Sequence, residues 1–170
     1  MTSAKNGFTL IELVITLIIV AILAVLAVPR IMDIGGMRLD TVVDKVAADI
    51  KYSREFAMNH NQRTRITFDA GAESYTIRAL DVQSGVWNII QDPTTRGNFQ
   101  VFLNLGACTG VVIMSANFDG QSAVEFNSYG APFTTGGALA AAGNVTLSNA
   151  AGDRSSVNVA PVTGRIEIVR

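Results

Sequence analysis

The stretch GFTLIELVITLIIVAILAVLAV, residues 7–28, decides how this sequence is organised. Between Leu13 and Val28 the only residue that is not aliphatic is Thr16. As a helix, residues 8–28 would be about 32 Å long, close to the roughly 30 Å hydrocarbon core of a bilayer. The sequence therefore predicts a transmembrane helix over residues 8–28.

The composition of the remaining chain is that of an ordinary globular domain. The 170 residues carry a net charge of −1, and the mean hydropathy of +0.34 comes largely from the apolar stretch. From Thr64 to the C-terminus there are six Arg, no Lys and eight Asp plus Glu, which argues against a phosphate-binding surface and against nucleic acid as a partner. The single cysteine, Cys108, excludes an intrachain disulfide, and its place near Val111 predicts a small buried residue instead of a reactive thiol.

Glu12 is a charged residue within the predicted apolar helix, and a helix that serves only as a signal or an anchor has no need of it. One simple alternative is a cleavable secretory signal, because Val25-Leu26-Ala27 resembles a small-residue cleavage site. The other is a plain membrane anchor. An isolated carboxylate in such a helix costs a few kcal/mol, and intramembrane ionisable residues are usually functional and paired. Neither alternative gains anything from Glu12.

The residues around Glu12 match a known pattern. Gly7-Phe8-Thr9-Leu10-Ile11-Glu12-Leu13 resembles the type IV prepilin signature. The resemblance implies that prepilin peptidase removes the leader, residues 1–7, by cleaving between Gly7 and Phe8, and that Phe8 becomes N-methylated. It also implies that Glu12 of one subunit neutralises the Phe8 amine of a neighbour during assembly. The partners that it implies are prepilin peptidase, other pilins or pseudopilins through helix bundling, the inner-membrane assembly platform and membrane lipid.

A bend or linker is predicted over residues 29–36. Pro29 has no N–H to donate and stands where many pilins carry a helix-bending proline. Gly35 and Gly36 each weaken a helix by about 1 kcal/mol relative to alanine. We expect these residues to permit local unwinding, and a plain linker is the alternative.

An amphipathic helix is predicted over residues 37–59. Its apolar stripe, which should pack on a sheet, comprises Leu39, Val43, Val46, Ile50 and Ala57, flanked by Val42, Ala47 and Phe56. The charged residues expected on a solvated or subunit-facing surface are Asp40, Asp44, Lys45, Asp49, Lys51, Arg54 and Glu55.

The period changes to two after Asn61, which indicates strands. Residues 64–69 and 74–80 form a predicted hairpin. Further predicted strands are 87–90, 99–103, 111–114, 123–127, 145–148, 156–159 and 164–169, and the glycine-rich segment 128–143 is predicted to be a loop. The predicted fold class is α+β: a long N-terminal helix, with a transmembrane half and an amphipathic half, packed on an antiparallel β-sheet or β-sandwich. The globular domain is expected to span 37–170, its β-rich part 64–170.

The order of these elements is similar to that of the GspH/FimT group of minor pseudopilins and minor pilins. The similarity lies in residues 48–57 followed by Ile66-Thr67-Phe68, and in the closing stretch 159–170. It implies a structural subunit of a type II secretion pseudopilus or a type IV pilus. It also implies a single-pass inner-membrane protein with its C-terminal domain in the periplasm or outside. DNA-binding FimT-like proteins carry a Gly-Arg-x-Arg tail, where this sequence has Gly164-Arg165-Ile166-Glu167.

The sequence contains no motif that indicates an enzyme. His60 is the only histidine, so histidine-based catalysis or a multi-histidine metal site would rest on one residue. Neither a Gly-x-Ser-x-Gly elbow nor a phosphate-binding loop occurs. We therefore predict no catalytic residue, no cofactor and no metal. Two other functions stay open, a DNA-binding minor pilin for DNA uptake and a bitopic ligand-binding domain.

Overall fold

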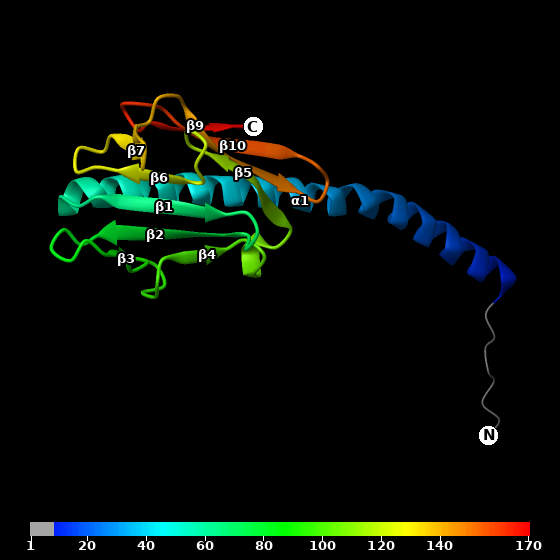
Figure 1. The fold of residues 1–170 in the computed structure, drawn as a ribbon. Coiled ribbons are helices and arrows are strands. Elements are labelled where there is room, and N and C mark those ends of the chain that lie inside the picture. Colours follow the sequence, from blue (N-terminus) through cyan, green and yellow to red (C-terminus); the bar gives the residue numbers. More distant parts are fainter. Residues whose placement is uncertain (1–8) are drawn as a thin grey trace, which may run out of the picture. The chain divides into compact units, whose positions relative to one another are not determined.

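The computed structural model describes residues 9–170, apart from the side chains of residues 24–35 and of Ala107. It contains helix α1, Leu10–His60, followed by strands and one short 3-10 helix (Figure 1). The chain divides into two compact units, residues 1–34 and 35–170. The predicted α+β class is confirmed.

The strands form two antiparallel sheets. The larger has the order β3-β2-β1-β6-β7-β8, with β4 also paired to β2, and the smaller has the order β11-β10-β9-β5. The strand bounds in the larger sheet are β1 Thr64–Asp69, β2 Ser74–Leu80, β3 Trp87–Ile89, β4 Gln100–Phe102, β6 Ala123–Phe126, β7 Pro132–Thr134 and β8 Gly137–Ala138. Those in the smaller sheet are β5 Val111–Asn117, β9 Gly143–Asn149, β10 Arg154–Val159 and β11 Ile166–Val169.

The core lies between the second half of α1 and the two sheets, and the cyan part of α1 runs behind both sheets in Figure 1. All five residues of the predicted apolar stripe are buried, as are Val42 and Ala47, while Phe56 is half-buried. A buried hydrogen bond also joins α1 to β1, because the Ser53 hydroxyl donates to Thr64 Oγ1 over 3.0 Å. The helical period of the sequence thus correctly identifies the face that meets the sheets.

Asp49 corrects the prediction that the charges of this helix all lie on a solvated surface. Its residue is only 9% exposed. Asp49 Oδ2 accepts hydrogen bonds from the Tyr75 hydroxyl and, over 2.9 Å, from Lys45 Nζ. Burial, and then the charge of Asp49, raises the pKa of Tyr75 well above that of a free tyrosine. A charge off the apolar stripe is tolerated here because β2 supplies a buried donor.

Two predictions about the β-rich part need correction. The segment 128–143, predicted as a loop, contains the short hairpin of β7 and β8. Pairing of β7 with β6, with Phe133 opposite Glu125, places this hairpin in the larger sheet despite its glycine content. Cys108 ends the 3-10 helix η1, Gly106–Cys108, and is half-buried against the core instead of fully buried. Burial raises the pKa of its thiol.

Candidate functional site

Helix α1 starts with a side-chain cap. Thr9 lies immediately before the first helical residue, and its carbonyl accepts the first helical hydrogen bond, from the Leu13 N–H over 3.2 Å. Its side-chain oxygen Oγ1 accepts from the Glu12 N–H over 3.3 Å. Thr9 is therefore the N-cap residue, and it accepts a hydrogen bond from the Glu12 N–H, which has no acceptor within the helix. Thr16, in contrast, donates back to the Leu13 carbonyl over 2.8 Å and has no more distant partner among the described residues.

Glu12 is exposed in the first turn of this helix. The helix N-terminus carries a partial positive charge, which favours a carboxylate here by about 0.3–1 kcal/mol. A capping threonine followed three residues later by glutamate is the sequence pattern of a capping box. The carboxylate is thus partly compensated within its own helix, but its side chain still faces outward.

The described residues around Glu12 are apolar on every side of the helix. Eleven large apolar side chains are exposed in this unit: Leu10, Ile11, Leu13, Val14, Ile15, Leu17, Ile18, Ile19, Val20, Ile22 and Leu23. A helix that is apolar all round needs a bundle of other helices or a lipid environment. Among the residues that the structure describes, no helix offers an apolar stretch of the length needed to cross a membrane. The predicted span over residues 8–28 begins one residue before the described part of the chain, and the side chains of its last five residues, 24–28, are not described.

The other predicted site residues are described only in part. Gly7 and Phe8 lie outside the described residues, so the cleavage site stays a prediction. The side chain of Pro29 is likewise not described. α1 includes Pro29, Gly35 and Gly36, and a methyl group added at Gly36 would meet no other atom within 4 Å. The bend over residues 29–36 also remains a prediction.

The turn at Gly164, which leads into the C-terminal strand, lies against Arg54 of α1 and the Gly130 carbonyl. The Arg54 guanidinium donates from Nε to the Gly130 carbonyl over 3.1 Å. Gly164 has a φ of +62°, and a side chain there would approach the Gly130 carbonyl to 2.6 Å, so only glycine fits. The next residues form an exposed ion pair, Arg165 Nη2 to Glu167 Oε1, at 2.6 Å. The acid therefore partly neutralises the arginine of the tail.

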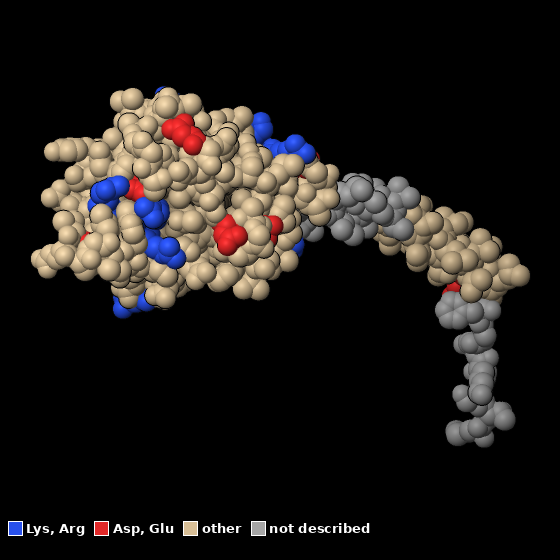
Figure 2. Space-filling view, in the orientation of Figure 1, with Lys and Arg blue, Asp and Glu red and all other residues tan. Residues whose placement is uncertain are grey.

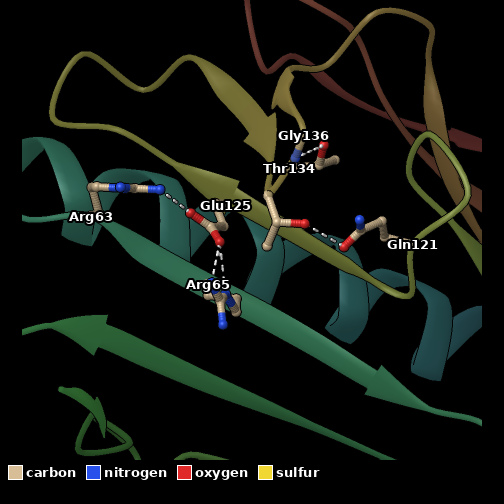
Figure 3. A network of polar contacts seen from close by, with 7 residues as sticks. Arg63, Arg65, Gln121, Glu125, Thr134 and Gly136 are labelled. Carbon is tan, nitrogen blue, oxygen red and sulfur yellow. Dashed lines mark hydrogen bonds and ion pairs between the residues drawn. The ribbon is translucent and has the colours of Figure 1, made fainter. Parts of the chain in front are cut away.

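A buried carboxylate organises the outer face of the larger sheet, the face turned away from α1. Glu125 of β6, whose residue is 1% exposed, accepts from Arg63 Nη2 through Oε2. Its other oxygen, Oε1, accepts from Arg65 of β1 through both Nε and Nη2. Figure 3 shows the two guanidinium groups reaching Glu125 from different sides. Two cations around one buried anion offset the cost of removing it from water.

Two family models match the chain. The prokaryotic N-terminal methylation motif matches residues 2–28, and the type II transport protein GspH matches residues 42–163, well over half of the sequence. The chain belongs to the GspH family. No curated protein matches the sequence.

Solved structures show the same fold as this GspH-family chain. The minor pseudopilin EpsH from the type 2 secretion system of Vibrio cholerae superposes with a TM-score of 0.58 at 11% identity, over 78% of this chain and 93% of EpsH. A second EpsH structure gives 0.57 at 11% identity, over 78% of this chain and 96% of that one. The type IV minor pilin FimU of Pseudomonas aeruginosa gives 0.51 at 13% identity, over 78% and 88%. The GspH-family chain is therefore a subunit of a pseudopilus or a pilus.

Family membership brings the general properties of prepilin-like proteins. They are processed by a prepilin peptidase, anchored in the inner membrane and then incorporated into a filament with other pilins. They are structural proteins. In the part of the GspH-family chain that the structure describes, no three His, Cys, Asp or Glu side chains gather in a way that would hold a metal.

Sequence reasoning missed two features of this site. The cap that Thr9 provides for α1 was not predicted, although the spacing Thr9-x-x-Glu12 carries that signal. The network of Glu125 with Arg63 and Arg65 was not expected either. It depends on β6 pairing with β1, strands far apart in the sequence, which no local pattern shows.

Proposed function

We propose that the chain is a minor pseudopilin or minor pilin whose assembly is directed by its N-terminal helix. Prepilin peptidase cleaves between Gly7 and Phe8, and Phe8 is then N-methylated. Residues 8–28 hold the subunit in the inner membrane as a single pass, with the domain of residues 37–170 in the periplasm or outside. The partners are the peptidase, other pilins or pseudopilins, the assembly platform and membrane lipid, and no cofactor, metal or catalysis is involved.

The observation that carries this proposal is Glu12, exposed in the first turn of α1, where the other residues described up to Leu23 are apolar apart from Thr16. After cleavage Phe8 bears a positive amine, and N-methylation keeps that charge. The amine of one subunit and the Glu12 carboxylate of the next are each costly in an apolar bundle, but together they form an ion pair. The pair also fixes axial register, because a slip would leave both charges without partners.

Blocking the cleavage tests this proposal. Gly7→Leu replaces the residue that the peptidase is expected to read, so the chain should keep its leader, stay in the membrane and be absent from sheared filaments. The matched control is Gly136→Ala in the β7–β8 turn, where the added methyl would meet only Thr134 Oγ1, at 3.7 Å. The control should be processed and incorporated normally. Filaments that contain full-length Gly7→Leu subunits would contradict the proposal.

DNA binding is the second function that the sequence left open, and we propose that it is absent. In the tail, Glu167 pairs with Arg165 where DNA-binding relatives carry a second arginine. Full-length protein in neutral detergent should leave a DNA duplex unshifted at micromolar concentration and physiological salt, because specific and non-specific binding both rest on phosphate contacts. Glu167→Arg, which removes the neutralising acid, should bind more tightly than wild type. A shift by the wild-type protein would refute the prediction.

A further inference from the structure

We infer that the outer face of the larger sheet is a docking surface for an acidic, extended segment of another protein. The surface, here called the arginine–aromatic face, consists of Arg63, Arg65 and Arg78 with the rings of Trp87 and Phe133. The inference is independent of leader processing, since it concerns only the domain beyond residue 35.

Register places these side chains together. Arg65 pairs with Arg78 of β2 on one side and with Glu125 of β6 on the other, and residues directly opposite in an antiparallel pair point to the same face. Glu125 in turn pairs with Phe133 of β7. Trp87 of β3 pairs with Leu80, whose N–H donates to the Arg63 carbonyl. Figure 2 shows basic side chains gathered over this sheet.

The aromatic rings and the buried carboxylate hold the first two guanidinium groups in place. Arg63 lies 4.5 Å from the centroid of Phe133 and 6.0 Å from that of Trp87. Arg65 lies 4.1 Å from the centroid of Trp87. Both also bond to Glu125, yet the side chain of Arg63 remains 44% exposed. A guanidinium fixed in this way has donors left for a bidentate carboxylate and loses little entropy on binding.

Arg78 has no such compensation. No described acid forms an ion pair with it, and it stands directly opposite Arg65, where a like charge destabilises a sheet by a few tenths of a kcal/mol or more. Three arginines thus face a single carboxylate, which leaves an excess of two positive charges on a face of a protein whose net charge is −1. Like charges that destabilise a sheet and have no neutralising partner within the protein are typical of a binding surface.

A groove of about 370 Å³ continues this face beside Arg63. It is lined by Asn127, Ala131, Pro132, Phe133, Gly137 and Ala138. Small and apolar walls next to a guanidinium suit a segment in which acidic and apolar side chains follow one another. Three cations are too few to follow a run of phosphates, and the acidic balance of the domain opposes nucleic acid. A carboxylate-bearing peptide is therefore the occupant that fits.

Trp87 provides a direct readout, because it is the only tryptophan of the chain and lies on this face. Full-length protein in neutral detergent micelles is titrated with a ten-residue glutamate peptide while the tryptophan emission is recorded. We expect a saturable change. Arg78→Gln should weaken the affinity about tenfold, the effect of one charge-assisted hydrogen bond, and Arg78→Lys should keep most of it.

The matched control is Arg154→Gln, an exposed arginine of β10 in the other sheet, which should bind like wild type. Arg78 does not contact Glu125, so its replacement leaves the buried network intact, and circular dichroism checks the fold of each variant. The inference is overturned if the emission does not saturate, or if Arg154→Gln weakens binding as much as Arg78→Gln. It is equally overturned if an oligothymidylate of the same charge binds more tightly than the peptide.

Discussion

Glu12→Val is expected to produce subunits that are processed normally but stay in the inner membrane and do not enter filaments. Membrane insertion should be at least as good as in wild type, because the variant removes a carboxylate from an apolar helix, where it would cost up to about 3 kcal/mol at the helix centre on insertion scales. The loss of Glu12 from the first turn removes at most about 1 kcal/mol of helix stabilisation, so α1 should still form. What disappears is the attraction that brings the Phe8 amine of the neighbouring subunit into register.

The matched control for this prediction is Thr16→Val, one turn further along the same helix. Its hydroxyl bonds only within α1, to the Leu13 carbonyl, so its removal should leave assembly unchanged. Each variant is expressed with its own secretion or pilus machinery, and sheared filaments are compared with the membrane fraction by immunoblot. Incorporation of Glu12→Val at the wild-type level would remove Glu12 from the assembly site.

Arg65→Met is expected to have the largest effect on the stability of the domain. Arg65 supplies two of the three hydrogen bonds to Glu125, whose side chain is only 2% exposed, and it also stacks on Trp87. Removing one partner of a buried ion pair costs about 3–5 kcal/mol. Because Arg63 remains and Arg65 is itself partly exposed, we expect about 2–3 kcal/mol, measured by urea unfolding of the full chain in detergent.

Arg78→Met serves as the control, since it removes the opposing arginine of β2 without touching Glu125. It should be neutral or slightly stabilising, because a like-charge pair across the strands is relieved. Arg65→Met combined with Glu125→Leu should recover much of the lost stability. A cost for Arg65→Met below that of Arg78→Met would show that the network around Glu125 does not support the sheet.

The apolar stripe of α1 could be predicted from the sequence, because helical periodicity is a local property. Leu39 and Ile50 show this most clearly, as both are buried. The burial of two acidic residues could not be predicted, because the groups that bond to them lie on strands distant in the sequence. Asp49 is buried because Tyr75 donates to it, and Glu125 because β6 pairs with β1. Neither contact can be predicted from the spacing of neighbouring residues in the sequence.

The hairpin of β7 and β8 escaped prediction for a related reason. Its residues have weak strand propensity, and glycine and alanine around Phe133 suggest a loop. Pairing with β6 outweighs this propensity. The Thr9 cap, in contrast, was present in the local pattern, since a threonine followed three residues later by glutamate marks a helix start.

The mature N-terminus shows directly whether the chain is a processed filament subunit. Protein isolated from native membranes and filaments is digested, and its N-terminal peptide is identified by mass spectrometry. We predict a chain that begins at N-methylated Phe8. A chain that begins at Val28, after Val25-Leu26-Ala27, would mark a secreted protein, and one that keeps residues 1–7 would mark a plain anchor. Either result would contradict the assignment as a processed filament subunit.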